Sequence, residues 1–95
     1  MLSIRARVGL SREVFARLLS ISPRVLATIE TGEEPSEPVR RRLTEVRRVI
    51  DALSGVIQDE AIGKWLLTPN DAFDGLKPLE VIERGEVDRI WRMVY

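Results

Sequence analysis

Two short helices joined by a tight turn are predicted between Ser11 and Gly32, and this pair constrains the rest of the chain more than any other stretch. Ser11 and Ser22 suit the capping position, because a serine hydroxyl can accept from a free N–H of the first turn, and Pro23 suits a first helical position. The expected apolar faces are Val14, Phe15, Leu18 and Leu19 in the first helix and Val25, Leu26 and Ile29 in the second. Helices this short are unstable alone, so they must pack on each other and on neighbouring elements.

The composition limits the class of protein. A chain of 95 residues with 44% apolar and 32% charged residues is expected to form one compact domain, or a small domain with an appendage. The chain has no cysteine and no histidine, which excludes disulfides and removes the commonest general base and metal ligand. It has no apolar run of 18 residues and no signal-peptide pattern. We therefore expect a cytoplasmic protein that is not an enzyme, uses no cofactor, metal or small-molecule substrate, and does not bind a membrane.

The net charge is zero, but the charges are unevenly distributed. Residues 1–50 hold ten arginines, no lysine and six acidic residues, whereas residues 51–95 hold five basic and nine acidic residues. Arginine presents a planar fork of donors that suits phosphate groups and guanine. The first half is therefore suited to nucleic acid, and the second half to a different partner.

The rest of the chain is also helical in pattern, and no stretch alternates as a strand does, so the predicted fold is all-α. Further helices are expected at residues 1–8, 36–53, 56–67, 78–84 and 86–95, with a single turn at 71–73 capped by Asn70. Arg5 and Arg7 are expected to point outward from the first of these. The helix over 56–67 is expected to bury Ile57, Ala61, Ile62, Trp65 and Leu66.

The helix over 36–53 carries apolar residues at alternating spacings of four and three. They are Val39, Leu43, Val46, Ile50 and Leu53. Such a seam favours packing into the core, with dimer formation as the alternative. Arginines cover the other faces of this helix, either as a solvated surface or as phosphate contacts, namely Arg40, Arg41, Arg42, Arg47 and Arg48.

The pair of short helices resembles the helix-turn-helix of Xre and phage-repressor DNA-binding proteins. The residues that match are Ser11, Ala16, Leu18, Ile21, Ser22, Ile29, Glu30 and Gly32. Ser20 stands where the family usually has glycine, at a position where a left-handed backbone is common. The resemblance implies that the second helix enters the major groove with its N-terminal residues against base edges.

On that helix, Arg24 can form a bidentate pair with guanine, and Thr28 can either donate to a base or meet a thymine methyl group. Ser22, Arg12 and Arg17 suit phosphate contacts, which position a protein without specifying sequence. The candidate DNA-binding residues are therefore Arg12, Arg17, Ser22, Arg24, Thr28 and Thr31. Because only one of these is a strong base reader, a homodimer on two half-sites about 34 Å apart is expected.

The run from Trp65 to Ile90 carries a second resemblance, to the toxin-binding domain of MbcA/ParS/Xre-type antitoxins. The residues that match are Trp65, Leu66, Pro69, Asn70, Ala72, Phe73, Gly75, Pro78, Leu79, Gly85 and Val87. The order of the two motifs is that of the fused antitoxins. It implies a repressor-like helix-turn-helix bundle at residues 1–54 and a small helical toxin-binding region at residues 55–95.

Together the resemblances imply an antitoxin of a type II RES–Xre toxin–antitoxin system. Such antitoxins neutralise a RES-domain toxin that degrades NAD, and the complex represses its own operon by binding double-stranded operator DNA. The candidate toxin-binding residues are Asn70, Asp71, Asp74, Lys77, Glu86, Arg89, Trp91, Arg92 and Tyr95. Trp65, Phe73 and Trp91 are interpreted first as aromatic supports that hold the loop over 68–77 against a small core.

Two other functions remain open. One is a stand-alone Xre-family transcriptional regulator whose second half is a dimerisation or effector module. The other is an antitoxin whose helix-turn-helix serves only as a scaffold, which the neutral overall charge permits. An enzyme is disfavoured, because the carboxylate pairs at residues 33–34 and 59–60 are better explained as a loop and a helix start, and no Gly-rich phosphate loop is present.

Overall fold

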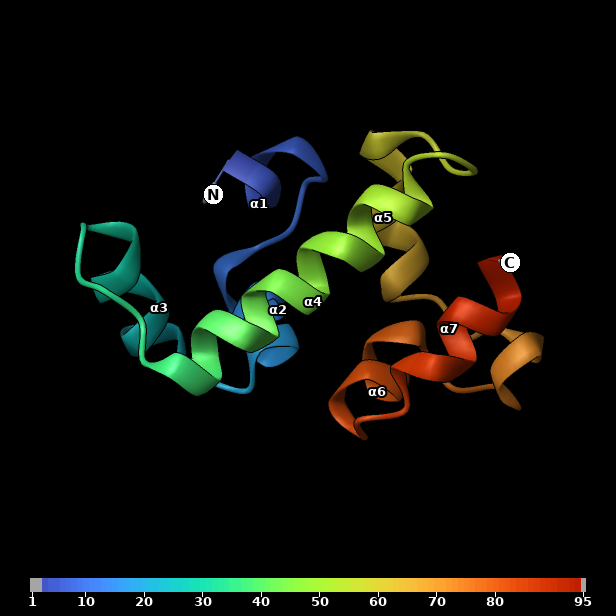
Figure 1. Ribbon diagram of the computed structural model, residues 1–95. Helices are drawn as coiled ribbons and strands as arrows, with labels where there is room; N and C mark the ends of the chain where they lie inside the picture. The colour runs from blue at the N-terminus through green and yellow to red at the C-terminus, as the bar shows by residue number, and fades with distance from the viewer. Residues whose placement is uncertain (1–2, 95) are drawn as a thin grey trace.

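The long helix α4 (Glu37–Leu53) crosses the molecule, and the other helices pack around it (Figure 1). The computed structural model describes residues 3–94, and every regular element in that range is helical, which confirms the all-α prediction. The elements before α4 are α1 (Ser3–Arg7), α2 (Arg12–Leu19) and α3 (Pro23–Glu30). Those after it are α5 (Asp59–Leu66), the 3₁₀ turn η1 (Asp71–Phe73), α6 (Pro78–Glu83) and α7 (Val87–Val94). Within residues 3–94 no helix is both long enough and apolar enough to cross a membrane.

The predicted pair of short helices is present as α2 and α3, with both serine caps in place. The Oγ of Ser11 accepts from the N–H of Val14 at 3.2 Å, and the Oγ of Ser22 accepts from the N–H of Val25 at 3.1 Å. Between the helices Ser20 has a φ of 58°, the left-handed conformation expected at this turn. Arg42 donates from Nη2 to the Oγ of Ser20 at 2.8 Å, so the turn is tied to α4.

One hydrophobic core joins both halves of the chain. It includes Phe15, Leu18, Leu26, Leu53, Ile62, Leu66, Phe73, Leu79 and Ile90, each almost fully buried. The apolar seam of α4 lies in this core, with Leu43, Val46, Ile50 and Leu53 buried and Val39 half-buried. Core packing within one chain, the favoured interpretation of the seam, is therefore confirmed. The division at residue 54 stays a prediction, because the two parts are built on the same core.

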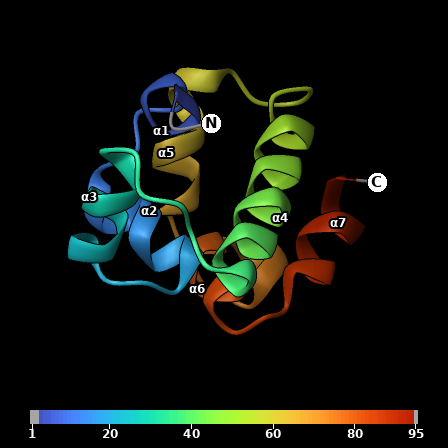
Figure 2. The same ribbon diagram turned by 60° about the vertical axis from the view of Figure 1, so that its left-hand side comes forward.

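The helix predicted over 56–67 begins only at Asp59, and its buried face differs from the predicted one. Val56 is 65% exposed and Ala61 is exposed, whereas Gly63 is buried. A Cβ atom on Gly63 would lie 2.8 Å from the carbonyl oxygen of Val8, so glycine lets α5 approach the α1–α2 connection closely. Figure 2 shows α5 beside α1 and α2. A hydropathy pattern could not identify this contact, because α5 meets the neighbouring backbone through a glycine, which has no apolar side chain.

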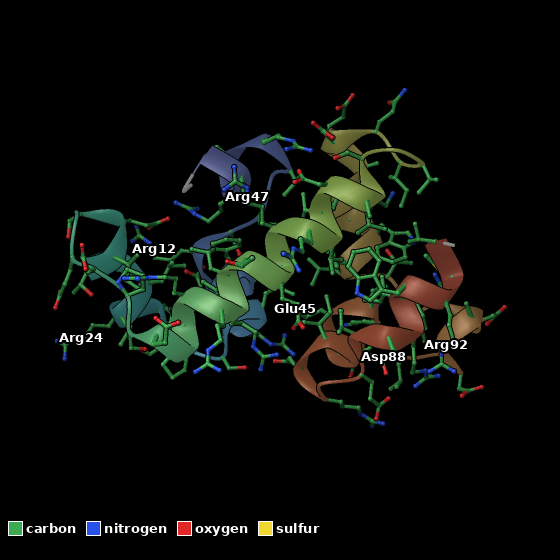
Figure 3. All side chains as sticks on the ribbon, in the orientation of Figure 1. Arg12, Arg24, Glu45, Arg47, Asp88 and Arg92 are labelled. Carbon is green, nitrogen blue, oxygen red and sulfur yellow. The ribbon has the colours of Figure 1, made fainter. Side chains whose placement is uncertain are left out.

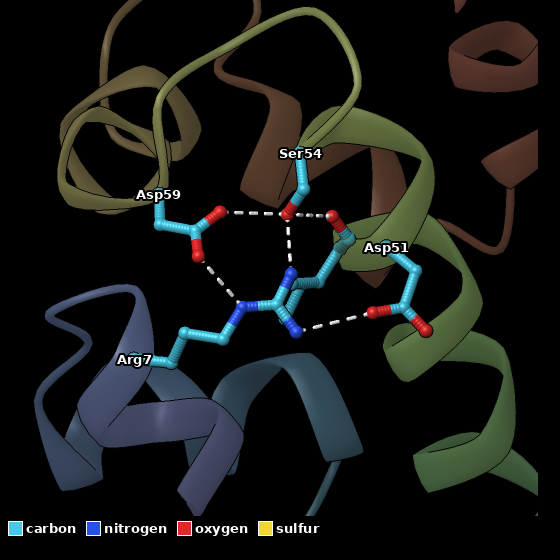
Figure 4. A network of polar contacts seen from close by, with 5 residues as sticks. Arg7, Asp51, Ser54 and Asp59 are labelled. Atoms are coloured by element: carbon cyan, nitrogen blue, oxygen red, sulfur yellow. Dashed lines mark hydrogen bonds and ion pairs between the residues drawn. The ribbon is translucent and has the colours of Figure 1, made fainter.

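Arg7 is exposed as expected and Arg5 is half-buried, and each makes ion pairs that hold α1 in place. Arg7 donates from Nε to Asp59 at 2.9 Å and from Nη1 to Asp51 at 3.2 Å, and its Nη2 donates to Ser54 (Figure 4). The Oγ of Ser54 lies 2.8 Å from Oδ1 of Asp59. Hydrogen bonds from Ser54 and then Arg7 hold the pKa of Asp59 below its ordinary value. This network joins α1 to the end of α4 and the start of α5.

We predict that Gly63→Ala lowers the free energy of unfolding by about 1–3 kcal/mol, the usual cost of overpacking a tight contact. The added methyl group would meet the backbone of residues 8 and 9, which cannot move aside as a flexible side chain can. Alanine is otherwise a better helix former than glycine by about 1 kcal/mol. Urea denaturation measures the change, with the exposed substitution Lys64→Ala on the same helix as control. A Gly63→Ala variant as stable as the wild type would contradict this packing.

Candidate functional site

The two predicted groups of functional residues lie at opposite ends of the molecule. In Figure 3 Arg24, on α3, points away from the body at one end, and Arg92, on α7, lies at the other. The longest dimension of the molecule is 37 Å. Arg24 and Arg92 therefore lie on different parts of the surface.

The outer face of α3 differs from the predicted one at Val25. Leu26 and Ile29 are buried as predicted, but Val25 is 43% exposed, so its assignment to the inward face is wrong. The physical reason is the narrow contact of α3, which packs chiefly on α2 and buries only one stripe of its surface. The hydroxyl of Thr28 donates to the carbonyl of Val25 at 2.7 Å, and that of Thr31 donates to the carbonyl of Thr28 at 2.9 Å.

The three arginines predicted to contact DNA are not equally available. Within residues 3–94, Arg24 makes no hydrogen bond or ion pair with another residue. Arg12 uses only its Nε, which donates to Glu30 at 2.9 Å. Arg17 uses both Nε and Nη2 in a bidentate pair with Glu83 of α6, each at 2.8 Å. Arg24 is therefore free to bind a base, Arg12 keeps its two terminal nitrogens, and the fork of Arg17 is already occupied.

Glu30 has a structural role at the centre of the motif. Its carboxylate accepts from Arg5 of α1 at 2.8 Å and from Arg12 of α2 at 2.9 Å, and its side chain is only 12% exposed. Burial raises the pKa of Glu30, but the hydrogen bonds from Arg5 and Arg12 outweigh it, so the pKa lies below its ordinary value. The charged carboxylate therefore fastens α1 and α2 to the end of α3.

The positive charge of the first half lies mostly outside the helix-turn-helix. Three of its ten arginines belong to residues 11–32, whereas five belong to α4. Arg40, Arg41, Arg47 and Arg48 are exposed on that helix. Any phosphate contact beyond those of α2 and α3 would therefore have to come from α4.

The loop between α5 and α6 is held by its own polar groups and by two aromatic rings. The Oδ1 of Asn70 accepts from the N–H of Ala72 at 2.9 Å, as predicted for a cap of η1. Asp74 has a left-handed backbone, with a φ of 57°. The buried ring of Phe73 meets the ring of Trp65 edge-on, with centroids 6.3 Å apart. The predicted aromatic support is confirmed for these two rings.

Arg89 of α7 fastens that loop from the other side. Its guanidinium carbon lies 5.8 Å from the centre of the Phe73 ring, and it donates to Asp74 at 3.2 Å and to Glu86 at 3.0 Å. Three predicted toxin-binding residues, Asp74, Glu86 and Arg89, thus form one cluster in which Arg89 bridges two carboxylates. Their first effect is to fix the shape of the surface.

The other predicted toxin-binding residues differ in exposure. Asp71, Lys77 and Arg92 are exposed. Arg92 lines a shallow hollow of about 270 Å³ together with Ala72, Arg89 and Met93. Met93 is 37% exposed and is not among the predicted toxin-binding residues. The sequence signal that could have found it is its position off the inward-facing stripe of α7. Tyr95 lies outside the described residues.

Trp91 joins α7 to the arginine-rich helix. It is half-buried, packs against the core and lines a hollow of about 420 Å³. The other residues of this hollow all belong to α4, namely Glu37, Arg40, Arg41, Thr44, Glu45 and Arg48. Trp91 therefore packs toward α4, and its predicted support of the loop over residues 68–77 stays a prediction. Within residues 3–94 no group of three or more acidic side chains is placed to hold a metal ion.

We predict that Arg89→Ala speeds amide hydrogen exchange of the loop over residues 68–77 roughly fivefold, because about 1 kcal/mol of local stability is lost with the contacts to Phe73, Asp74 and Glu86. Exchange in α2 should not change. Hydrogen–deuterium exchange followed by mass spectrometry measures both regions. Arg92→Ala, an exposed change on the same helix, is the control, and equal exchange in the two variants would show that Arg89 does not hold the loop.

Comparison with known proteins relates this arrangement to one group of proteins. No protein-family model matches the chain. The mycobacterial cidal antitoxins MbcA of Mycobacterium tuberculosis and Mycobacterium bovis are 29% identical to it over 89 residues, covering 93% of this chain and 79% of theirs. A chain in the crystal structure of the M. tuberculosis MbcT–MbcA toxin–antitoxin complex superposes with a TM-score of 0.82 at 28% identity, covering 98% of this chain and 85% of that one.

The likeness covers nearly the whole chain in sequence and in fold, so it includes both candidate surfaces and the core that joins them. The relatives are antitoxins and not enzymes, in agreement with the expectation of a non-enzymatic chain. In sequence and in fold this chain is therefore similar to the MbcA antitoxins.

Proposed function

We propose that this chain is an antitoxin that binds a cognate protein toxin in the cytoplasm and neutralises it. One observation carries the proposal: the chain resembles MbcA over 93% of its length and has the fold of a chain in the MbcT–MbcA complex, with a TM-score of 0.82. The identity of the toxin as a RES-domain protein that degrades NAD is a finer part of the proposal. It is supported by the match between residues 65–87 and the toxin-binding pattern.

The toxin contact is proposed at the exposed end of the second half. Protein interfaces combine an apolar centre with a charged rim. Met93 supplies exposed apolar surface there, Arg92 lies beside it, and Asp71 and Lys77 are further exposed charges of the second half. Asn70, Asp74, Glu86 and Arg89 support this surface by fixing the loop and the start of α7.

The second part of the proposal is that a homodimer binds operator DNA through α3 and represses the operon of the pair. The outer face of α3 supports it, because Arg24 is free to pair with guanine and Ser22 begins the helix with the expected cap. Arg12 retains two terminal nitrogens for a phosphate group. Two copies with their α3 helices one helical turn of DNA apart, about 34 Å, would double the contacts.

Affinity capture from a lysate of the source cells, with the full-length chain as bait, tests the antitoxin part. We expect a RES-domain protein in near-stoichiometric amount whose consumption of NAD stops when the chain is added. Met93→Asp should weaken capture at least tenfold, because a charge is placed in the proposed apolar centre. Val56→Asp, at an exposed apolar position in the α4–α5 connection, is the control. Recovery of nucleic acid alone would replace this proposal with the stand-alone regulator.

Titration of DNA binding with salt tests the second part, using duplexes selected from a randomised pool. Arg24→Ala should relax sequence preference by about 1–3 kcal/mol. Arg12→Ala should weaken binding to all sequences and reduce the salt slope by about one. Arg17→Ala should change binding little, because Glu83 already occupies its fork. Affinity that is independent of salt would indicate a scaffold instead of a DNA reader.

A further inference from the structure

The solvent face of α3 carries one large apolar side chain, that of Val25, which is 43% exposed. Within residues 3–94 four large apolar side chains are strongly exposed, namely Val25, Val56, Leu67 and Met93. Val25 is the member of this set that lies on α3, beside the unpaired guanidinium of Arg24. Leu26 and Ile29 form the buried face of α3. The exposed part of the Val25 side chain therefore adds nothing to the packing of the helix-turn-helix.

The polar groups around Val25 are already satisfied within the helix. The N–H of Val25 donates to Ser22, and its carbonyl accepts the hydroxyl of Thr28 at 2.7 Å. The proton of the Thr28 hydroxyl is therefore used inside α3, and what Thr28 offers to a ligand is its methyl group and an acceptor oxygen, but no donor. Of the two roles that the sequence leaves open for Thr28, this geometry favours contact with a methyl group over donation to a base.

Val25 and Thr28 form a fixed apolar patch. Residues three apart on a helix are neighbours on its surface, and both side chains are β-branched, so their χ1 angles are strongly restricted in a helix. Arg24 is four residues before Thr28 and borders the same patch. Binding against this patch would therefore order few additional side-chain torsions, which favours a specific contact.

We propose that Val25 and Thr28 read a thymine through its C5-methyl group, next to the guanine that Arg24 binds. Thymine is the one DNA base that presents a methyl group in the major groove, and apolar side chains contact it there. The proposal rests on the DNA-binding part of the proposed function and adds to it a specificity-determining pair of residues. Each operator half-site is then expected to hold a thymine beside the guanine.

Deoxyuridine substitution tests the proposal, because deoxyuridine pairs as thymidine does but lacks the methyl group. Each thymine of a duplex selected with the full-length chain is replaced in turn, and affinity is measured by fluorescence anisotropy. At one position per half-site we expect wild-type binding to weaken about fourfold, as for the loss of one buried methyl group. Val25→Ala should bind the thymine duplex more weakly than the wild type, and deoxyuridine at that position should weaken its binding less than it weakens that of the wild type, because only the Thr28 methyl contact remains.

Three variants separate the methyl group from other effects. Thr28→Ser keeps the hydroxyl but lacks the methyl group, so it should lose part of the sensitivity to deoxyuridine. Thr28→Val keeps a methyl group at the position of the threonine methyl and should retain the sensitivity. Val56→Ala, at an exposed valine outside α3, should behave as the wild type. Val25→Ala truncates a side chain outside the buried core and introduces a good helix former, so the fold should be preserved.

The outcomes distinguish failure of this inference from failure of the proposed function. If duplexes are selected but deoxyuridine is tolerated at every position, or if Val25→Ala keeps the full sensitivity, the patch does not read thymine and DNA binding still stands. If no duplex is selected, both the patch and the DNA-binding part are overturned. The antitoxin part is judged separately, by capture of the toxin.

Discussion

Burial of the apolar seam of α4 is the interaction on which the rest of the structure depends. This helix packs against α2 on one side and α7 on the other, so its apolar residues belong to both halves of the chain. A chain of 95 residues is too short to bury two independent cores of useful size. Sharing one helix between the halves solves this problem, and it fixes the two candidate surfaces at opposite ends of one body.

The ion pairs of this protein matter more for which donors they leave free than for the stability they add. Exposed pairs contribute little to folding, typically less than about 1 kcal/mol each. Yet the pair with Glu83 occupies the fork of Arg17, and the pair with Glu30 leaves the terminal nitrogens of Arg12 free. Net charge along the sequence therefore overestimates the positive surface available to DNA, because part of the charge is neutralised inside the chain.

Local patterns predicted most of the helices and their caps. Ser11, Ser22 and Asn70 cap the elements that they were expected to cap, because a capping hydrogen bond involves residues only two or three apart. The exposure of Val25 could not be predicted in this way. Periodicity identifies the apolar residues of a helix but not the width of the contact that its neighbours offer.

Contacts between distant segments could not be predicted from the sequence, for a different reason. The approach of Gly63 to Val8 and the pair between Arg17 and Glu83 join residues more than 50 positions apart, and a single sequence carries no signal for either. The candidate site was affected most by this limit. The residues on its surfaces were largely identified, but their availability depends on partners that only the fold brings together.

The shared core has a consequence for the lifetime of the protein. Because the two ends are built on the same buried residues, neither end is expected to unfold by itself while the other remains folded. A ligand that binds the folded state at either end therefore stabilises the whole chain, by about 2.7 kcal/mol when its concentration is 100 times its dissociation constant. A ligand bound at one end therefore also lowers the fraction of molecules in which the opposite end is unfolded and open to proteases.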